Sequence, residues 1–291
     1  MFKNKKICVF GGSGSIGREI VSQLLDREPN VVRIFSNDEN GLFDTKQEFG
    51  ETNTKIRCIL GDIRDLRAVE MALKDIDYCI NAAAYKHVEI CEYNPIQAVS
   101  TNIIGLNNII IACFYNNVER LLQISTDKAI EPSSTMGATK MIGERICKAR
   151  NFAKGTHRTI ISCVRFGNVL GSRGSLVPKI QEQIRKGFIV TLTDEKMKRY
   201  LIEKKEAGKF IINTLEIMQG GEIFVPKLKE ILIKDLIQDI INQYAPLAFK
   251  DPNSIQIKII GSYPGEKLTE KLLTEEELSR AIDKENMWVI K

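Results

Sequence analysis

The sequence lacks the residue patterns of metal sites and disulfide frameworks. Its seven cysteines are widely separated, no two of them form a Cys-x-x-Cys pair, and only two histidines are present. We therefore predict no bound metal and no disulfide framework. Several cysteines fall within apolar strand-like runs, where a thiol packs as a small hydrophobic group. This usage is typical of a reducing compartment, so we expect a cytoplasmic protein.

Long apolar runs and an excess of one charge are also missing. No run of about 18 apolar residues occurs, so we expect no membrane span, and the N-terminus lacks the apolar core of a signal peptide. The 42 Lys and Arg residues exceed the 37 Asp and Glu residues by 5, and the charges are mixed along the chain. We predict no nucleic-acid partner, because the densest basic run, at residues 3–6, has no interleaved aromatic residue. The mild basic excess suits a phosphorylated small substrate instead.

Short apolar strand patterns alternate with helical patterns from the first residues onward. Helical patterns lie between the predicted strands, as at 66–74 and 98–115. Such an order indicates an α/β fold with a mostly parallel sheet covered by helices on both faces. We predict a Rossmann-type doubly wound parallel sheet. Its expected strands are 6–10, 31–36, 56–60, 78–82, 121–125 and 159–164.

The regular alternation ends near residue 167. Gly171, Gly174, Pro178 and Gly187 interrupt the following part, and further strands are expected at 189–192, 222–225 and 255–260. We divide the chain into a nucleotide-binding Rossmann domain over 1–166 and a smaller region over 167–291. The second region is expected mainly to bind substrate, with some segments returning to the main sheet.

A glycine-rich turn, GGSGSIG at 11–17, follows the first predicted strand and opens the first helix. Glycine at 11 permits a tight turn, at 14 it lets a pyrophosphate approach the backbone, and at 17 it lets helix and strand pack closely. The helix N-terminus adds unpaired N–H groups. An ordinary tight turn is the alternative, but this context favours a dinucleotide. The expected cofactor contacts here are Gly11, Ser13, Gly14, Ser15, Ile16 and Gly17.

Acidic residues follow the second and third predicted strands, where the adenosine half of a dinucleotide is expected. Ser36, Asn37 and Asp38 end the second strand, and Asp62 and Ile63 follow the third. An acid at the end of the second strand binds ribose hydroxyls, whereas an arginine there favours a 2′-phosphate. Both carboxylates can equally be solvated turn residues.

The predicted fifth strand ends in a group of polar residues, Thr126, Asp127 and Lys128. Ligands of open parallel sheets bind at the carboxyl ends of the strands, and an adjacent acid and amine can give and take protons. A helix then begins, on which Met136 and Lys140 are four residues apart and share a face. A surface ion pair at the strand end is the alternative.

These residues belong to a longer set of motifs that resembles the extended short-chain dehydrogenase family. Within it, the resemblance is to the branch of UDP-N-acetylglucosamine 4,6-dehydratases of polysaccharide and flagellin-sugar synthesis. The matching stretches span nearly the whole chain, and the STDKA and MGATK pair is the most specific. They include GGSGSIG at 11–17, GDIRD at 61–65, AAAYKHVEICEYNP at 82–95, STDKAIEP at 125–132, MGATK at 136–140, RFGNVLGSRGS at 165–175 and PGEKLTEKLL at 264–273.

The resemblance implies a tightly bound NADP or NAD that is regenerated in each turnover. The C4 hydroxyl of the sugar is oxidised, water leaves across C5 and C6, and hydride returns to C6. Asp127 would then protonate the departing C6 hydroxyl, Lys128 would act as the base at C5, and Thr126 would bind the C4 oxygen. Lys140 would hold the nicotinamide ribose, and its charge would lower nearby pKa values.

Other residues receive roles more loosely. Ala82, Ala83 and Ala84 would line the cofactor, and Lys86 would contact the cofactor or the sugar. The planar fork of arginine suits phosphate, although surface ion pairing is the alternative for each charged residue. The residues expected on the UDP-sugar side are Lys86, Asn168, Arg173, Arg199 and Glu266.

Three positions depart from the family pattern. Met136 stands where short-chain dehydrogenases usually carry the tyrosine base, although one branch of these dehydratases also has Met there. The oxidation base would then be Asp127, Lys128 or a water. Asn37 replaces the usual Arg, which weakens the case for NADP, and Tyr263 replaces an Arg near the UDP.

Two other functions fit parts of the pattern. A UDP-sugar 4-epimerase would share the fold and the first hydride step, but it needs no acid for water loss and normally needs the tyrosine. A catalytically silent nucleotide-binding protein would explain Met136, Asn37 and Tyr263 but not an intact Asp127–Lys128 pair. We also expect a homo-oligomer, at least a dimer, through a bundle of the helices at 98–115 and 136–153, because the family pairs them so.

Overall fold

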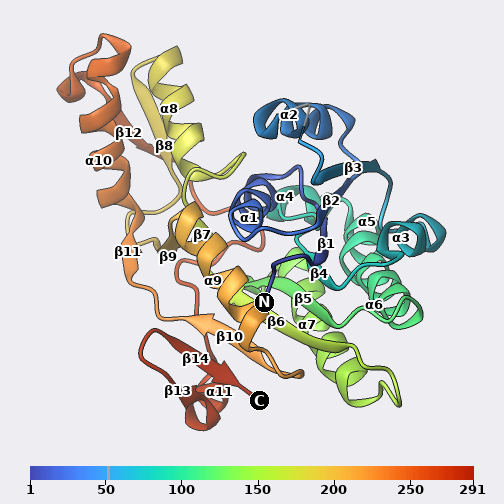
Figure 1. The fold of residues 1–291 in the computed structure, drawn as a ribbon. Helices are drawn as coiled ribbons and strands as arrows, with labels where there is room; N and C mark the ends of the chain where they lie inside the picture. The colour runs from blue at the N-terminus through green and yellow to red at the C-terminus, as the bar shows by residue number, and fades with distance from the viewer. Residues whose placement is uncertain (51–52) are drawn as a thin grey trace.

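A nine-stranded sheet forms the body of the protein, in a computed structural model that describes residues 1–50 and 53–291 (Figure 1). Seven neighbouring strands are parallel, and two short antiparallel strands extend one edge. This arrangement confirms the predicted Rossmann-type fold. From edge to edge the strands are β13 (Ile282–Asp283), β14 (Met287–Ile290), β10 (Ile223–Pro226), β6 (Ile160–Phe166), β5 (Arg120–Thr126), β4 (Tyr78–Asn81), β1 (Lys6–Phe10), β2 (Val31–Ser36) and β3 (Ile56–Leu60).

Helices cover both faces of this sheet, and side chains alternate between them. On β1, Ile7 and Val9 pack into one core, and Cys8 and Phe10 pack into the other. A strand buried on both sides therefore reads as a continuous apolar run. The helices on the first face are α1 (Ser15–Leu25), α2 (Glu39–Phe49) and α9 (Lys204–Ile217), and those on the second are α3 (Leu66–Leu73), α6 (Leu106–Tyr115) and α7 (Thr135–Phe152).

Residues 95–115 form one continuous helical stretch with a change in its winding. It comprises α5 (Pro95–Val99), a π-helical segment η1 (Ser100–Gly105) and α6. Its 21 residues are long and apolar enough to cross a membrane by length and composition, but 56% of its most apolar window is buried within the protein. It contacts α3 and α7, so in the structure it serves as a core helix. The sequence analysis did not expect a candidate span.

A separate lobe stands beside the sheet and has its own apolar core (Figure 1). Ile180, Ile184, Ile237 and Ile241 meet there and are fully buried. The amphipathic spacing of these isoleucines, on two helices, explains why the lobe packs as a layer on a small parallel pair of strands. Its elements are α8 (Leu176–Lys186), β8 (Ile189–Leu192), α10 (Ile233–Tyr244) and β12 (Gln256–Ile259).

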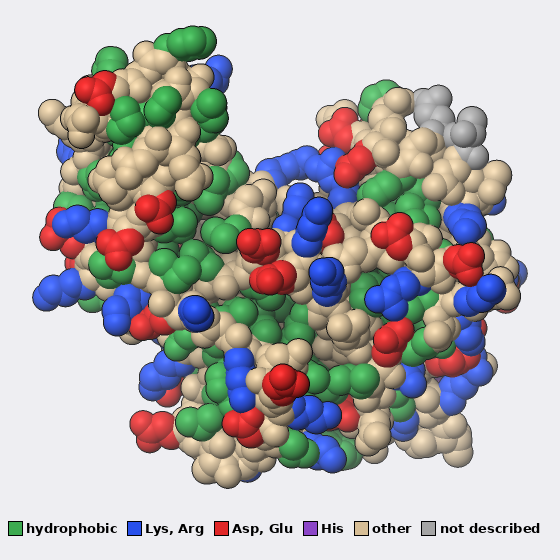
Figure 2. All heavy atoms as spheres, turned by 60° about the vertical axis from the view of Figure 1, so that its left-hand side comes forward, with side chains coloured by type: hydrophobic (Ala, Val, Ile, Leu, Met, Phe, Trp, Pro, Cys, Tyr) green, Lys and Arg blue, Asp and Glu red, His purple; other side chains and the backbone are tan. Residues whose placement is uncertain are grey.

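A three-stranded sheet lies between the lobe and the main sheet. It consists of β7 (Asn168–Val169), β9 (Lys198–Ile202) and β11 (Glu230–Leu232). The chain joins the main sheet at β10 before it forms β11 and the later part of the lobe, and it returns to the main sheet after the short helix α11 (Glu275–Arg280), through β13 and β14. Figure 2 shows a notch between the lobe and the main body, with acidic and basic side chains along its borders.

Arg165 on β6 ties this returning segment to the body. Only 1% of its side chain is exposed. Its guanidinium donates to both oxygens of Glu144 on α7 and to both oxygens of Glu277 on α11. It also donates to the Leu272 carbonyl. One buried cation thus fixes three segments of the chain at the same point.

Candidate active site

The glycine turn joins β1 directly to α1. Gly11 has a φ of +70°, and a side chain there would come within 2.7 Å of the Ala83 nitrogen. A Cβ at Gly17 would lie 2.2 Å from the Gly11 carbonyl oxygen. These two positions therefore require glycine, one for its backbone conformation and both for close packing. Gly14 is the N-cap of α1, and no side chain of the described residues caps that end of the helix.

A pocket opens over this turn at the carboxyl ends of β1, β2, β3 and β4. Most of the predicted cofactor residues meet there, although the sequence analysis did not name four of its lining residues. Phe35 and Gly61 directly adjoin predicted residues, so their strand ends carried a usable signal. The predicted lining residues are Gly11, Ser13, Gly14, Ser36, Asn37, Asp38, Asp62, Ile63, Ala82, Ala83 and Ala84, and the additional ones are Phe35, Gly61, Tyr85 and Thr101.

The two acids predicted beside the adenosine half of a dinucleotide already have partners. Asp38 Oδ1 accepts from the Gly41 nitrogen at 2.9 Å and so caps α2, and its Oδ2 lies 3.3 Å from the Arg173 guanidinium. Asp62 accepts from Arg64, whose hydrogen bond and charge hold the Asp62 pKa below its usual value. Ser13 and Ser36 bond to each other at 2.7 Å. The polar floor of the pocket is thus held in place before any ligand arrives.

Arg173 contacts the glycine turn and Asp38 and lines neither described pocket, whereas the resemblance implied a contact on the UDP side. Its backbone nitrogen donates to Ser15 Oγ at 2.8 Å, and its guanidinium reaches Asp38. Its carbonyl accepts from Lys86 Nζ at 2.7 Å. The segment around Arg173 therefore runs from the glycine turn to Lys86, and Lys86 is not among the residues that line either described pocket.

The Asp127–Lys128 pair leaves the end of β5 and is deeply placed. Asp127 is fully buried, and its Oδ1 accepts from the Thr126 hydroxyl at 2.9 Å and from Lys128 Nζ at 3.0 Å. Asp127 Oδ2 has no hydrogen-bond partner among the described residues. A buried carboxyl oxygen without a partner is costly for the fold, and such groups are typical of reactive sites.

Lys128 gathers further oxygen atoms around its ammonium. Besides Asp127, it donates to Asn168 Oδ1 at 3.2 Å and lies 3.6 Å from Glu270 Oε1. Glu270 is buried, and burial raises the pKa of its carboxyl; the negative charge of Asp127 raises it further, against the opposing charge of Lys128. The sequence analysis did not name Glu270, although the PGEKLTEKLL motif that contains it was recognised.

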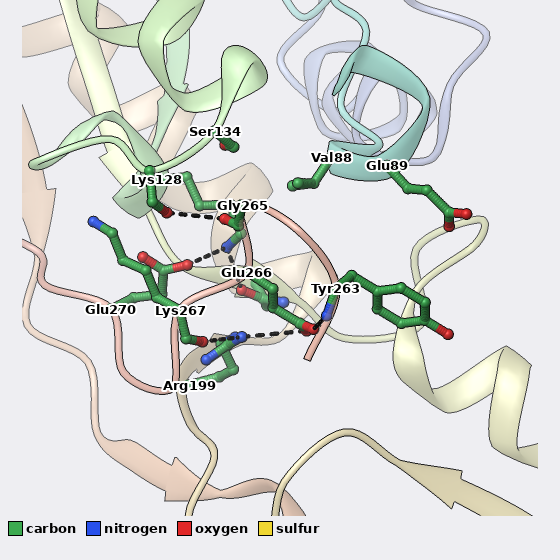
Figure 3. A pocket seen from close by; sticks show the side chains of 12 residues that line it. Val88, Glu89, Lys128, Ser134, Arg199, Tyr263, Gly265, Glu266, Lys267 and Glu270 are labelled. Atoms are coloured by element: carbon green, nitrogen blue, oxygen red, sulfur yellow. Dashed lines mark hydrogen bonds and ion pairs between the residues drawn. The ribbon is translucent and has the colours of Figure 1, made fainter. Parts of the chain in front are cut away.

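A second pocket opens in front of this cluster, between the body and the returning segment (Figure 3). Four predicted residues meet in it, from the turn after β5, from β7, from β9 and from the 263–270 segment. Arg199 lies 3.6 Å from Glu266 and also donates to three backbone carbonyls, so it is fixed in position. The predicted lining residues are Lys128, Asn168, Arg199 and Glu266; the others are Val88, Glu89, Ser133, Ser134, Tyr263, Gly265, Lys267 and Glu270.

Met136 and Lys140 lie on α7, behind the cluster. Met136 is buried and packs with Cys91 and Ala98. Lys140 Nζ donates to the Ile124 carbonyl on β5 at 3.0 Å, and burial lowers its pKa to about 8 against the opposing charge of Glu144. Neither residue is among those that line the two described pockets.

The chain matches one family model over nearly its whole length. Residues 7–291 match the family described as polysaccharide biosynthesis protein. A solved structure, Pen from Bacillus thuringiensis, superposes with a TM-score of 0.97 at 39% identity, covering 100% of this chain and 88% of that one.

Three relatives of similar length extend this finding. An uncharacterized membrane protein of Methanocaldococcus jannaschii is 45% identical, covering 99% of this chain and 86% of its own length. A UDP-N-acetylglucosamine 4,6-dehydratase (inverting) of Campylobacter jejuni is 37% identical (100% and 84%). A UDP-glucose 4-epimerase of Rickettsia massiliae is 34% identical (97% and 82%). The chain therefore belongs to the polysaccharide biosynthesis protein family of extended short-chain dehydrogenases, as its motifs predicted.

Proposed function

We propose that the protein is a nicotinamide-dependent 4,6-dehydratase of a UDP-N-acetylhexosamine, with UDP-N-acetylglucosamine as the first candidate. The observation that carries the proposal is the Asp127–Lys128 pair at the end of β5, next to the second pocket, with one Asp127 oxygen still unpaired among the described residues. Dehydration needs both an acid and a base, because hydroxide is a poor leaving group and the C5 proton must be removed.

The first pocket fits an NAD or NADP cofactor. The uncapped N-terminus of α1 faces it, and the glycines at 11 and 14 leave room for a pyrophosphate beside the backbone. When bound, the nicotinamide would take hydride from C4 and return it to C6. Ser15, Ile16 and Gly17, in the first turn of α1, would hold the phosphates through their N–H groups.

The residues of this chain would divide the proton transfers and the binding. Asp127 would protonate the departing C6 hydroxyl, Lys128 would remove the C5 proton, and Thr126 would bind the C4 oxygen. Lys140 would hold the nicotinamide ribose from α7. Asn168, Arg199 and Glu266 would hold the UDP-sugar, since they line the pocket that contains Lys128.

Incubation of the purified protein with UDP-N-acetylglucosamine and NAD or NADP tests the proposal. We expect a product lighter than the substrate by one water, with a methyl group at C6 in its NMR spectrum. A product of unchanged mass but altered C4 configuration would indicate an epimerase instead, which the Rickettsia relative makes the second candidate. No turnover across a panel of UDP-sugars would favour a silent nucleotide-binding protein.

We also propose that two copies associate through α5, η1, α6 and α7. Ile96, Ile104 and Ile142 are 71%, 50% and 38% exposed on these segments, an unusual amount of aliphatic surface for core helices. Light scattering at micromolar concentration should give at least twice the chain mass of 32.9 kDa. A single species of 32.9 kDa would refute the association.

A further inference from the structure

Two buried carboxyl groups share one lysine in the second pocket. Asp127 comes from the end of β5, and Glu270 comes from the segment before α11. Lys128 Nζ lies 3.0 Å from Asp127 Oδ1 and 3.6 Å from Glu270 Oε1. Their side chains are 0% and 4% exposed. Figure 3 shows Lys128 and Glu270 on the same side of the pocket.

Each carboxyl group also has one oxygen that the fold leaves unused. Asp127 Oδ2 and Glu270 Oε2 are buried and have no hydrogen-bond partner among the described residues. A carboxylate accepts hydrogen bonds at both oxygens, whereas a protonated carboxyl group can donate one. Two buried carboxyl groups thus share one ammonium through one oxygen each, and each leaves its other oxygen unpaired among the described residues.

We propose that Asp127 and Glu270 form a carboxyl dyad on Lys128 that holds one shared proton at neutral pH, and that the dyad supplies the proton to the departing C6 hydroxyl. The inference rests on the proposed dehydration. Two carboxylates and one ammonium leave one uncompensated negative charge in a buried place, and a single bound proton removes it. The proton belongs to the pair rather than to either residue.

The other charged groups around the dyad do not replace this proton. The Arg199 guanidinium already donates hydrogen bonds to the carbonyls of Lys198, Lys267 and Leu268, and it forms an ion pair with Glu266. Lys267 Nζ donates to the carbonyls of Ile130 and Glu131. Tyr200 on β9 faces Asp127, and burial and nearby negative charge raise the pKa of its phenol, which keeps it neutral. Burial, and after it the charge of Asp127, raises the pKa of Glu270, whereas the positive charges of Lys128, Arg199 and Lys267 lower it and only partly offset the rise.

The dyad also balances the protons of the reaction without a tyrosine. As the C4–H bond gives hydride to the cofactor, the C4 hydroxyl loses its proton to the ionised carboxylate of the dyad. The dyad then gives one proton to the C6 oxygen, the C6–O bond breaks, and water leaves. As that proton leaves, Lys128 Nζ passes one of its own protons to Asp127 Oδ1, 3.0 Å away, and the neutral amine takes the C5 proton. It returns this proton to C5 as hydride reaches C6, and it then recovers its own proton from the dyad. The dyad ends with the single proton it started with.

The pH dependence of turnover in Glu270→Gln tests the dyad. Without the second carboxylate, the site should lose its proton at a lower pH and can then no longer supply it to the C6 oxygen. We expect the alkaline limb of the kcat profile to shift to lower pH by at least about one unit. Above the shifted limb, this is roughly a tenfold loss of turnover. KM should change little, and Glu270→Asp should restore the limb.

Glu277→Gln serves as the structural control. Glu277 is a partly buried carboxyl from the same part of the chain, but it bonds to Arg165 outside the pocket. The loss of the Glu277 carboxylate should lower the melting temperature of the protein without moving the alkaline limb of the kcat profile. A pH-independent loss of turnover in Glu270→Gln, or an unmoved limb, would overturn the dyad.

A second measurement needs no substrate. In protein labelled with ¹³C at the Asp and Glu carboxyl carbons, the wild type should show one carboxyl titrating above about pH 6, and Glu270→Gln should lack it. If the wild type shows this titration but removes no water from a UDP-sugar, the dyad stands and the proposed function fails. If the wild type dehydrates its substrate but shows no such titration, the dyad fails and the function stands.

Discussion

The two pockets of this protein are built in opposite ways. The nucleotide pocket takes all its described lining residues from positions 11–101, and glycines, alanines and strand ends form much of its surface. The second pocket joins residues 88–168 to residues 199–270 and is lined by lysines, glutamates and an arginine. The backbone therefore forms much of the first pocket, whereas charged side chains that the fold brings together form much of the second. Substitutions should affect the two pockets separately.

Asp127→Asn should give the largest difference between its effect on turnover and its effect on nucleotide affinity. The amide keeps the shape of the side chain but cannot donate the carboxyl proton, so turnover should fall by about 10² to 10⁴ while nucleotide affinity stays unchanged. Single-turnover absorbance of the reduced nicotinamide should show it accumulating. If reduced cofactor never appears, Asp127 is required for the oxidation of C4, and the assignment to water loss is wrong.

Arg165→Met tests whether the second pocket depends on the returning segment. Methionine leaves Glu144 and Glu277 buried without their cation, which should cost about 3–5 kcal/mol in the free energy of unfolding. Urea denaturation at pH 7 measures it. The exposed Arg185→Met is the control, and the loss of its surface pair with Glu182 should cost less than about 1 kcal/mol.

The cost of Arg165→Met should also depend on pH. Burial alone would raise the pKa of Glu277, but the hydrogen bond and charge of Arg165 outweigh it and lower the pKa below its ordinary value of 4.5. This contribution is complete above the unfolded pKa and is lost as pH falls through the lower folded pKa. The difference between wild type and variant should therefore shrink below about pH 4. A constant difference would mean that Glu277 does not depend on Arg165.

Gly14→Asp should damage only the nucleotide pocket. Its side chain would enter the space beside the Gly11 carbonyl and place a negative charge where the pyrophosphate is expected. Affinity for NAD and NADP should fall at least about a hundredfold, or roughly 2.7 kcal/mol. Gly187→Asp is a matched control, because nothing lies within 4 Å of a Cβ there. Unchanged affinity in a folded Gly14→Asp protein would mean that the glycine turn binds no dinucleotide.

The smallest effect is expected from Arg173→Gln, beside the Asp38 side of the first pocket. Asn37 offers no positive charge to a 2′-phosphate, so NAD should compete well with NADP, with a preference for NADP below about a hundredfold. Arg173 forms an ion pair with Asp38, and its loss should reduce any preference for NADP by less than about tenfold. A larger preference that survives Arg173→Gln would mean that another cation binds the phosphate.

The sequence predicted the first pocket much better than the second. The strands at 6–10, 31–36 and 56–60 occur at the predicted bounds. The first two are largely buried apolar runs, and the third is an edge strand that its apolar residues still marked, although several of its residues are exposed. Glycines and strand-end acids then mark the pocket locally. Glu270 carries no such mark, because it lies in a stretch without regular structure, and only the fold brings it to Lys128. The lobe of α8, β8, α10 and β12 was foreseen only as two of its strands, since its helices pack on each other rather than on the main sheet.

The residues of the two pockets lie far apart along the chain, so they are synthesised at different times. During synthesis, the last residue that lines the nucleotide pocket is Thr101, whereas Glu270 is made 169 residues later. At ribosomal rates of about 5–20 residues per second, this is an interval of roughly 10–30 s. Every described residue that lines the first pocket is therefore made well before the second pocket can be complete. A nascent chain stalled before residue 270 would contain the lining of the first pocket but would lack the second carboxyl group beside Lys128.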